Sequence, residues 1–136
     1  MNIRYYYFID EFNKKEIEKL SSQISLIYRN YNKKNDPKEL RKLVIYCKNN
    51  RRKVYISNNL KDGIKYNFNG LYIPSFHKQL RFRNIIKKNL EIIGSAHNYK
   101  EIKQKELQKV DLIFIASLFN KKKTYLGINK FMILTN

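Results

Sequence analysis

Short apolar runs alternate with longer polar segments along the whole chain. Runs of about four to six residues are each followed by a polar turn and then by residues with helical spacing. The runs predict strands over residues 5–9, 24–28, 54–57, 70–73, 92–93 and 112–116. Because these runs are mostly apolar and do not alternate, they indicate a parallel sheet covered by helices.

The helix after the second run has the clearest signals. Asp36 is a suitable N-cap, and Pro37 suits the first helical position. Leu40, Val44 and Cys47 follow at helical spacing and form one apolar stripe. We therefore expect a helix that begins at residue 37 and packs this stripe on the sheet.

Helical spacing also predicts four weaker helices. One covers residues 12–22 and turns Ile17 and Leu20 inward, and a short one after the third strand uses Ile64 as its main apolar contact. Another covers about residues 78–88, with inward positions at Leu80 and at Ile85 or Ile86. The last begins with a capping box made by Asn98 and Glu101.

This order repeats a strand–helix unit about six times within one domain, residues 1–136. The pattern predicts an α/β fold of the (β/α) TIM-barrel type with about six of its eight units present. Residues 130–136 look like the start of a sixth helix that stops in mid-pattern. A fragment of a full barrel and a natural six-unit protein both remain open at this point.

The amino-acid composition gives the chain a strong positive charge. The chain has 29 Lys and Arg against 11 Asp and Glu, a net charge of +18. Such a charge attracts nucleic acids and anionic membranes. However, the lysines are spread along the whole sequence, and the abundance of Lys, Asn, Ile and Tyr is typical of an A/T-rich genome. We therefore favour compositional drift over a nucleic-acid footprint.

The cysteine count and the lengths of the apolar runs limit which sites the chain can form and where in the cell we expect it. Cys47 is the single cysteine, so the chain has no internal disulfide or cysteine-based zinc site, and its apolar setting predicts a buried, inert thiol. No apolar run approaches the length of a membrane span, and the aromatic, early acidic N-terminus is unlike a signal peptide. We expect a soluble cytoplasmic protein.

Polar residues gather where the predicted strands end. In a parallel α/β fold these carboxyl ends meet at one face, where ligands bind. The set is rich in cations and amides and poor in carboxylates, which favours binding of phosphate or pyrophosphate. Its members are Asp10, Arg29, Asn58, Asn59, Ser75, Ser95, His97, Ser117 and Lys121 to Lys123.

Several of these residues also have structural interpretations. Arg29 either clamps a phosphate or pairs with Asp10. Asn58 and Asn59 either bind a ligand or form a turn and an N-cap. His97 has no evident carboxylate partner, so a structural role is favoured over a general base. The run 121–123 is either an anion cradle or a solvated loop.

Other reaction classes lack their motifs. The sequence has no Gly-rich loop of the dinucleotide or nucleoside-triphosphate type, no His-Glu-x-x-His and no Gly-x-Ser-x-Gly. Hydride transfer, zinc proteolysis and esterase chemistry are therefore poorly supported.

Five segments in register carry a resemblance to a known family. The chain resembles the thiamine phosphate synthase and TenI-type thiazole tautomerase superfamily, in a lysine- and asparagine-rich form. The segments occur in the family order over nearly the whole chain, and they are residues 24–29, 54–59, 69–75, 92–97 and 113–119, with Leu126 and Gly127 beyond.

The resemblance implies an eight-stranded (β/α) barrel and a thiamine biosynthetic role. A thiamine phosphate synthase joins a pyrimidine pyrophosphate to a thiazole phosphate and releases pyrophosphate with Mg²⁺. The segments for strands seven and eight, with the glycine-rich phosphate loop, are absent here, which favours the fragment interpretation. Small-molecule phosphates are the partners that we expect, rather than a membrane or a nucleic acid.

The family motifs carry over only in part. Arg29 matches the arginine of Gln-x-Arg-x-Lys, although Ile27 and Tyr31 replace its other two residues. Asn58 matches the asparagine of the Asn-Asp pair, and Asn59 replaces the aspartate that the family directs toward Mg²⁺. The resemblance therefore implies a Mg²⁺ cofactor whose ligands are not evident in this sequence.

The remaining family positions lie later in the chain. The second metal aspartate would fall near Phe76 or His77, which cannot replace a carboxylate. Ser95 matches the serine after strand five, and Lys122 or Lys123 corresponds to a phosphate-binding lysine. Ser117 stands where the tautomerase has histidine.

Three functions follow. The first is a thiamine phosphate synthase whose phosphate contacts are Arg29, Asn58, Asn59, Ser95, Lys122 and Lys123. The second is a non-catalytic or tautomerase-like protein that binds a thiazole or thiamine phosphate. The third is a basic RNA-binding module, which requires a contiguous basic face.

Overall fold

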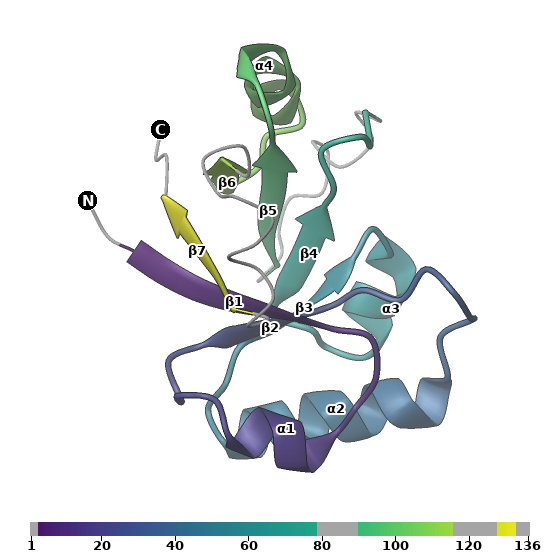
Figure 1. The fold of residues 1–136 in the computed structure, drawn as a ribbon. Coiled ribbons are helices and arrows are strands. Elements are labelled where there is room, and N and C mark those ends of the chain that lie inside the picture. Colours follow the sequence, from purple (N-terminus) through teal and green to yellow (C-terminus); the bar gives the residue numbers. More distant parts are fainter. Residues whose placement is uncertain (1–2, 79–89, 116–127, 133–136) are drawn as a thin grey trace.

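The protein is an α/β protein whose parallel sheet curls into a half-barrel (Figure 1). The computed structural model describes residues 3–78, 90–115 and 128–132. Six strands run parallel, in the spatial order β6-β5-β4-β3-β2-β1, and β7 joins the outer edge of β1. The strands are β1 (Ile3–Ile9), β2 (Ser25–Tyr28), β3 (Val54–Ser57), β4 (Gly70–Ile73), β5 (Glu91–Ala96), β6 (Leu112–Ile115) and β7 (Ile128–Met132).

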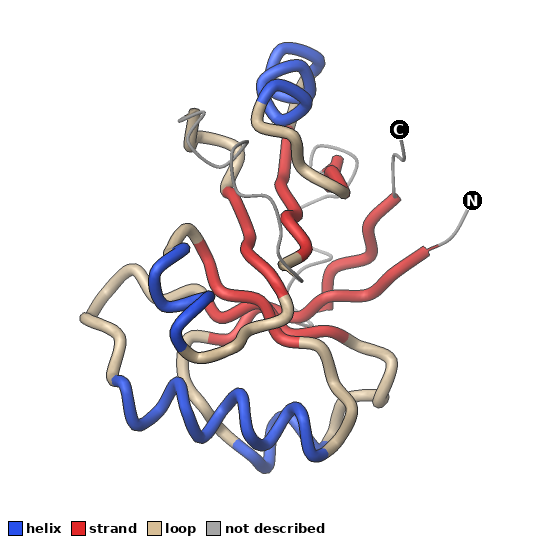
Figure 2. The backbone as a smooth tube through the Cα atoms, turned by 180° about the vertical axis from the view of Figure 1, so that it is seen from behind, coloured by secondary structure: helices blue, strands red, loops and turns tan. Residues whose placement is uncertain are grey.

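Helices connect β1 to β2, β2 to β3, β3 to β4 and β5 to β6, and they cover the outer face of the sheet. In the described ranges they are α1 (Lys14–Glu18), α2 (Pro37–Asn49), α3 (Leu60–Lys65) and α4 (Tyr99–Leu107). Figure 2 shows the longest helix, α2, running below the strands, with α4 at the opposite end of the molecule. Within these ranges no helix is long and apolar enough to cross a membrane.

The six predicted strands and the caps of α2 are confirmed. Asp36 is the N-cap of α2 and accepts a hydrogen bond from the Lys38 amide, and Pro37 opens the helix. Leu40, Val44 and Cys47 are all buried, as the apolar stripe predicts. Local sequence signals were therefore sufficient to place these elements.

Two local predictions were wrong. Ile64 is 56% exposed, because α3 turns Gly63 toward the sheet instead, where an added Cβ atom would lie 3.4 Å from Ile56 Cγ2. The predicted helix start at residues 130–136 is a strand as far as Met132. Since β1 would otherwise have an unpaired edge, the backbone of β7 pairs with it antiparallel, from Ile3↔Met132 to Tyr7↔Ile128. Residues 79–89, where the predicted helix over 78–88 falls, lie outside the described residues.

Two apolar layers lie on opposite faces of the sheet. The outer layer packs the helices on the strands and includes Ile17, Leu40, Leu43 and Cys47. Among the described residues, the inner layer consists of strand residues and is rich in aromatic rings. Its members are Tyr6, Ile27, Tyr55, Tyr72, Ile93, Leu112 and Phe114. The interior of the half-barrel is thus filled by side chains at its centre.

A polar cluster closes the amino-terminal end of this interior. Tyr55 donates a hydrogen bond to the Glu91 carboxylate, and Arg4 pairs with the same carboxylate at 3.4 Å. Burial raises the pKa of Tyr55, and the neighbouring Tyr6 and Glu91 raise it further. The opposite, carboxyl end of the strands therefore provides the polar mouth in which ligand chemistry is expected.

A buried arginine holds the first helix. Arg52 is 8% exposed and follows α2. Its Nη1 donates to the carbonyls of Ser21 at 2.9 Å and Ile24 at 2.7 Å. Its Nη2 donates to the carbonyls of Ile17 at 3.4 Å and Leu20 at 3.3 Å. Arg52 thus satisfies the carbonyls at the end of α1 and in the turn into β2.

Candidate functional site

Arg29 follows β2 at its carboxyl end, and its guanidinium contacts two aromatic rings. Its Cζ lies 3.9 Å from the centroid of the Phe8 ring and 5.5 Å from that of the Tyr31 ring. Its backbone amide donates to the Ile9 carbonyl at 2.8 Å. A cation–π contact restrains a guanidinium through its face, and N–H groups at its edge can still donate to a neighbouring hydroxyl or an anion.

Arg29 does not take the alternative role of pairing with Asp10. Within the described part of the chain there is no ion pair between these two residues, and Asp10 is exposed. The sequence analysis did not predict that Arg29 would contact aromatic rings.

Two buried hydroxyls on neighbouring strands lie near Arg29. The Tyr72 hydroxyl and Ser95 Oγ are 2.9 Å apart, and both residues are at most 5% exposed. The Tyr72 ring packs edge-on to Phe8, with centroids 5.4 Å apart. Burial raises the pKa of Tyr72, and its hydrogen bond to Ser95 and the charge of Arg29 oppose this effect. We call Phe8, Arg29, Tyr72 and Ser95 the interior site.

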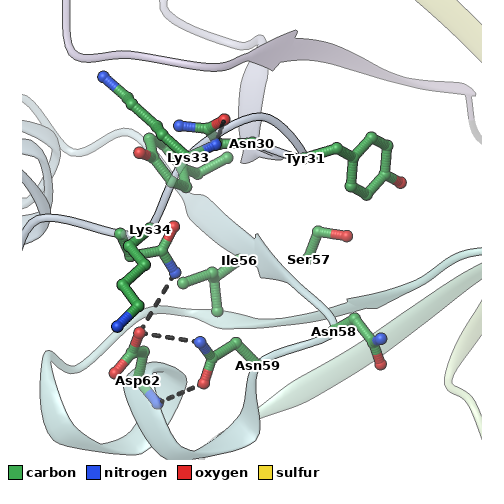
Figure 3. A pocket seen from close by; sticks show the side chains of 11 residues that line it. Asn30, Tyr31, Lys33, Lys34, Ile56, Ser57, Asn58, Asn59 and Asp62 are labelled. Atoms are coloured by element: carbon green, nitrogen blue, oxygen red, sulfur yellow. Dashed lines mark hydrogen bonds between the residues drawn. The ribbon is translucent and has the colours of Figure 1, made fainter.

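A cavity of about 480 Å³ opens beside the interior site, between the segments that follow β2 and β3 (Figure 3). Asn30, the neighbour of Arg29, is one of its wall residues. The cavity combines two lysines, several amides and one carboxylate. It is lined by Tyr28, Asn30, Tyr31, Lys33, Lys34, Asn35, Ile56, Ser57, Asn58, Asn59 and Asp62.

Asn59 has the structural role that the cap interpretation predicts. Its Oδ1 accepts a hydrogen bond from the Asp62 amide at 3.0 Å, so Asn59 is the N-cap of α3. Its Nδ2 donates to Asp62 Oδ2 at 2.9 Å, and Asn35 Nδ2 donates to the same oxygen at 3.2 Å (Figure 3). The Asn59 amide is therefore engaged within the protein on both sides.

Asn58 has an unusual backbone and a partly unsatisfied side chain. Its φ of 51° lies in the left-handed region, which asparagine tolerates better than most residues. Its Nδ2 is 3.4 Å from His77 Nδ1, whereas its Oδ1 is buried and has no hydrogen-bond partner among the described residues. The neighbouring Ser57 Oγ is likewise buried and has no hydrogen-bond partner among the described residues. Unsatisfied buried oxygens and backbone strain are concentrated at functional positions.

His97 has a carboxylate partner that the sequence did not reveal. Its Nδ1 is 3.2 Å from Glu101 Oε1, and its backbone amide donates to the same oxygen at 2.7 Å. These hydrogen bonds, the backbone one first, lower the pKa of Glu101. Because His97 is exposed and belongs to the cap of α4, where Asn98 is the N-cap, it has a structural role here.

The structure describes only some of the other predicted strand-end residues. Ser75 is buried at 8% exposure in the loop after β4. Ser117 and residues 121–123 lie outside the described residues, so the predictions for Lys122 and Lys123 stay predictions. Of the predicted set, Arg29 and Ser95 meet at the interior site, and Asn58 and Asn59 line the cavity.

The residues that the structure describes do not fit a Mg²⁺ site. Mg²⁺ prefers carboxylates with octahedral geometry. Asp62 is the carboxylate of the cavity wall, and its Oδ2 already accepts two amide hydrogen bonds. Across the described ranges there is no group of three His, Cys, Asp or Glu residues that suits a metal ion. Phe76 and His77 occupy the second family position, without a carboxylate.

Sequence reasoning missed the aromatic and lysine components of the site. Phe8 and Tyr72 face the interior of the half-barrel, and Tyr31, Lys33 and Lys34 follow β2. Strand periodicity offered a partial signal, because Gly70 and Tyr72 are two residues apart and share a face. Which face is concave depends on the curl of the sheet, which no local pattern encodes.

The sequence was also compared with known proteins. No protein-family model matches it, and a search of curated proteins finds no match either.

Proposed function

We propose that this chain binds the phosphate or pyrophosphate group of a small molecule at the interior site and the adjoining cavity. The specific proposal is a thiamine phosphate synthase-like protein built on an eight-stranded (β/α) barrel plan. The observation that supports it best is the guanidinium of Arg29 over the Phe8 ring, close to Tyr72, whose hydroxyl is paired with that of Ser95. Fixed donors of this kind suit an anionic group at the carboxyl ends of parallel strands.

The proposed reaction depends on departure of pyrophosphate. The bond between the pyrimidine methylene carbon and a pyrophosphate oxygen breaks, and that oxygen keeps the electron pair. The thiazole nitrogen then supplies the electron pair of the new carbon–nitrogen bond. Arg29 stabilises the negative charge that grows on the leaving oxygen, and the hydroxyl of the Tyr72–Ser95 pair that accepts from the other keeps its own proton to donate to the same group. Because these donors are preorganised, they lower the barrier without reorganising.

The cavity supplies a second anionic contact region. Lys33 and Lys34 belong to the segment after β2 and line the same cavity as Asn58, with the Lys34 amine beside Asp62 (Figure 3). A second phosphate, that of the thiazole, would be attracted there while the pyrophosphate lies against Arg29. The reaction needs two anionic substrates close together, and the two features are adjacent through Arg29 and Asn30.

The test is formation of thiamine phosphate from the pyrimidine pyrophosphate and the thiazole phosphate, with and without Mg²⁺. We expect product with the wild-type chain and a loss of about 10- to 100-fold in kcat/KM with Arg29→Gln, since a charged hydrogen bond is removed. Arg41→Gln is the matched control, because Arg41 is an exposed arginine on α2 beside the Tyr66 ring. Equal turnover by Arg29→Gln and wild type would contradict the role of Arg29.

A second candidate function is binding without turnover. The cavity favours it specifically, since Asn59 and Asp62 are engaged with each other and do not fit a metal site. It predicts calorimetric binding of thiamine phosphate or thiazole phosphate that is weakened by Arg29→Gln, with no product under any condition. Product formation would decide for the synthase, and absence of both binding and product would reject both functions.

A further inference from the structure

Three side chains at the end of α4 bind the loop that follows β4. Lys105 Nζ and Gln108 Nε2 each donate to the His77 carbonyl at 2.9 Å. Gln104 Nε2 donates to the next carbonyl, that of Lys78, at 2.7 Å. Two consecutive carbonyls of one loop are therefore held by three donors from one helix.

Lys105 is the most unusual of these donors. It is 0% exposed, and the aliphatic part of its side chain runs between α4 and β5. Gly94 makes room for it, since a Cβ atom at position 94 would be 2.7 Å from Lys105 Cδ and 3.3 Å from Cε. The lysine and the glycine are thus fitted to each other.

Burial of this amine destabilises the fold, and the packing of this layer does not need an amine. An ammonium group loses its hydration on burial, and a Leu or Met would fill the same layer without that cost. Within the described residues Lys105 forms no ion pair. Its polar contact is the hydrogen bond to the His77 carbonyl, so this contact is what the buried amine provides.

The loop that Lys105 holds reaches the cavity. His77 Nδ1 lies 3.4 Å from Asn58 Nδ2, and Asn58 is a cavity residue with a left-handed backbone. An Asn58 amide that donates to Nδ1 requires a neutral His77 ring with its proton on Nε2. The chain of contacts therefore runs from α4, through the carbonyl and ring of His77, to Asn58 at the cavity wall.

We propose that Lys105, supported by Gln108, is a positioning residue that fixes the His77 ring against Asn58 and so orients the Asn58 amide toward an anionic ligand in the cavity. The ligand part of this proposal rests on the proposed function. The positioning part concerns residues within the protein and is independent of it. Lys105 acts through the loop and does not contact the ligand.

The first measurement is the NMR resonance of the histidine ring Cε1–H groups. The chain has two histidines, so His97, which pairs with Glu101, is an internal reference. We expect Lys105→Met to shift the His77 resonance and leave that of His97 unchanged. Lys103→Met, an exposed site on the same helix, is the control and should move neither. An unchanged His77 resonance in folded Lys105→Met would overturn the proposal.

The second measurement is calorimetric binding of inorganic pyrophosphate. Lys105→Met should weaken binding about five- to tenfold, the scale of one lost hydrogen bond, while Lys103→Met leaves it unchanged. If wild type binds no pyrophosphate, the proposed function fails, yet the His77 shift still tests the positioning. If wild type and Lys105→Met bind pyrophosphate with equal affinity, the proposal that the loop after β4 affects ligand binding is rejected.

A second variant covers the case in which Lys105→Met does not fold. Gly94→Ala keeps the amine and forces its stem to move, because of the 2.7 Å approach to Cδ. It should shift the same His77 resonance and leave His97 in place. A folded Gly94→Ala with the wild-type His77 resonance would count against the coupling.

Discussion

At the residue scale, Arg52 is a basic side chain with a structural role that its neighbours do not share. Arg51 and Lys53 on either side are exposed, whereas Arg52 donates to four backbone carbonyls around the end of α1. Nothing in the local run of basic residues distinguishes the buried one. Its role depends on where α1 packs, which is a tertiary property.

Substitution of Arg52 by methionine should be strongly destabilising. The change removes four hydrogen bonds to backbone carbonyls, including the one at the buried Ile24 carbonyl, and we expect a loss of about 2–4 kcal/mol in the free energy of unfolding. Urea denaturation followed by circular dichroism measures it. Arg51→Met is the control, with an expected change of about 0.5 kcal/mol or less for an exposed site. Similar losses for both variants would show that the carbonyl contacts contribute little.

The buried amine of Lys105 should make the free energy of unfolding depend on pH. Burial lowers the pKa of Lys105 to about 8 from the usual 10.5, and the Glu101 carboxylate opposes this shift. Between pH 8 and 10.5 the unfolded chain binds more protons at this site than the folded chain. This group therefore favours folding increasingly as pH rises through that window, and below pH 8 its burial penalty is present in full.

The measurable quantity is the difference in unfolding free energy between wild type and Lys105→Met. It should change in favour of wild type from pH 8 to pH 10 in urea titrations, because the variant lacks the titrating amine. Lys103→Met, whose site is exposed, should show a difference that stays nearly constant. A constant difference for Lys105→Met as well would mean that the folded and unfolded pKa values are equal.

At the element scale, three helices end in the same way. Arg51, Asn67 and Lys109 have φ angles of 55°, 61° and 60°, and each lies two positions beyond the last residue of α2, α3 or α4. The next amide in each case donates back to a carbonyl five residues earlier, as from Val110 to Lys105. This is a Schellman ending, in which glycine is the preferred residue.

Lys109→Gly should therefore stabilise the protein. A left-handed conformation costs a lysine about 1 kcal/mol relative to glycine, so we expect a gain of about 0.5–1 kcal/mol in the free energy of unfolding. Thermal and urea unfolding both measure it. Lys103→Gly, within α4, is the opposite control and should lose about 1 kcal/mol. A loss at Lys109 comparable to that at Lys103 would contradict the Schellman assignment.

Some of the helices and strands could be predicted from the sequence, and others could not. Strand positions and the start of α2 could be predicted, because Asp36, Pro37 and the apolar runs act locally. The orientation of a six-residue helix such as α3 and the identity of β7 could not, since Gly63 and the open edge of β1 decide them through packing. Likewise, Arg29 and Ser95 could be assigned to one end of the sheet, but the Phe8 and Tyr72 rings around Arg29 follow from its curl.

At the scale of the whole molecule, the charge of +18 is largely uncompensated within the fold. In the described ranges there are three ion pairs, and two of them, Lys14–Glu18 and His97–Glu101, join residues one helical turn apart. Repulsion between like charges destabilises a compact state, and salt screens it over about 10 Å at 0.1 M.

We therefore expect the free energy of unfolding to rise as NaCl increases from about 0.01 to 0.3 M. Urea, which is uncharged, is the appropriate denaturant. At equal ionic strength, phosphate should stabilise more than chloride if an anion binds at Arg29, and Arg29→Gln should remove that excess. A stability that falls with NaCl would show that the ion pairs outweigh the repulsion.

Cys47 gives the molecule an internal reporter of opening. It is the single cysteine of the chain, it lies fully buried on α2 in the outer apolar layer, and burial raises its pKa to about 11. A thiol reagent at neutral pH can therefore react only when α2 separates from the sheet. Labelling rates in native buffer would measure how often that separation occurs, and would distinguish local detachment of α2 from cooperative unfolding of the half-barrel.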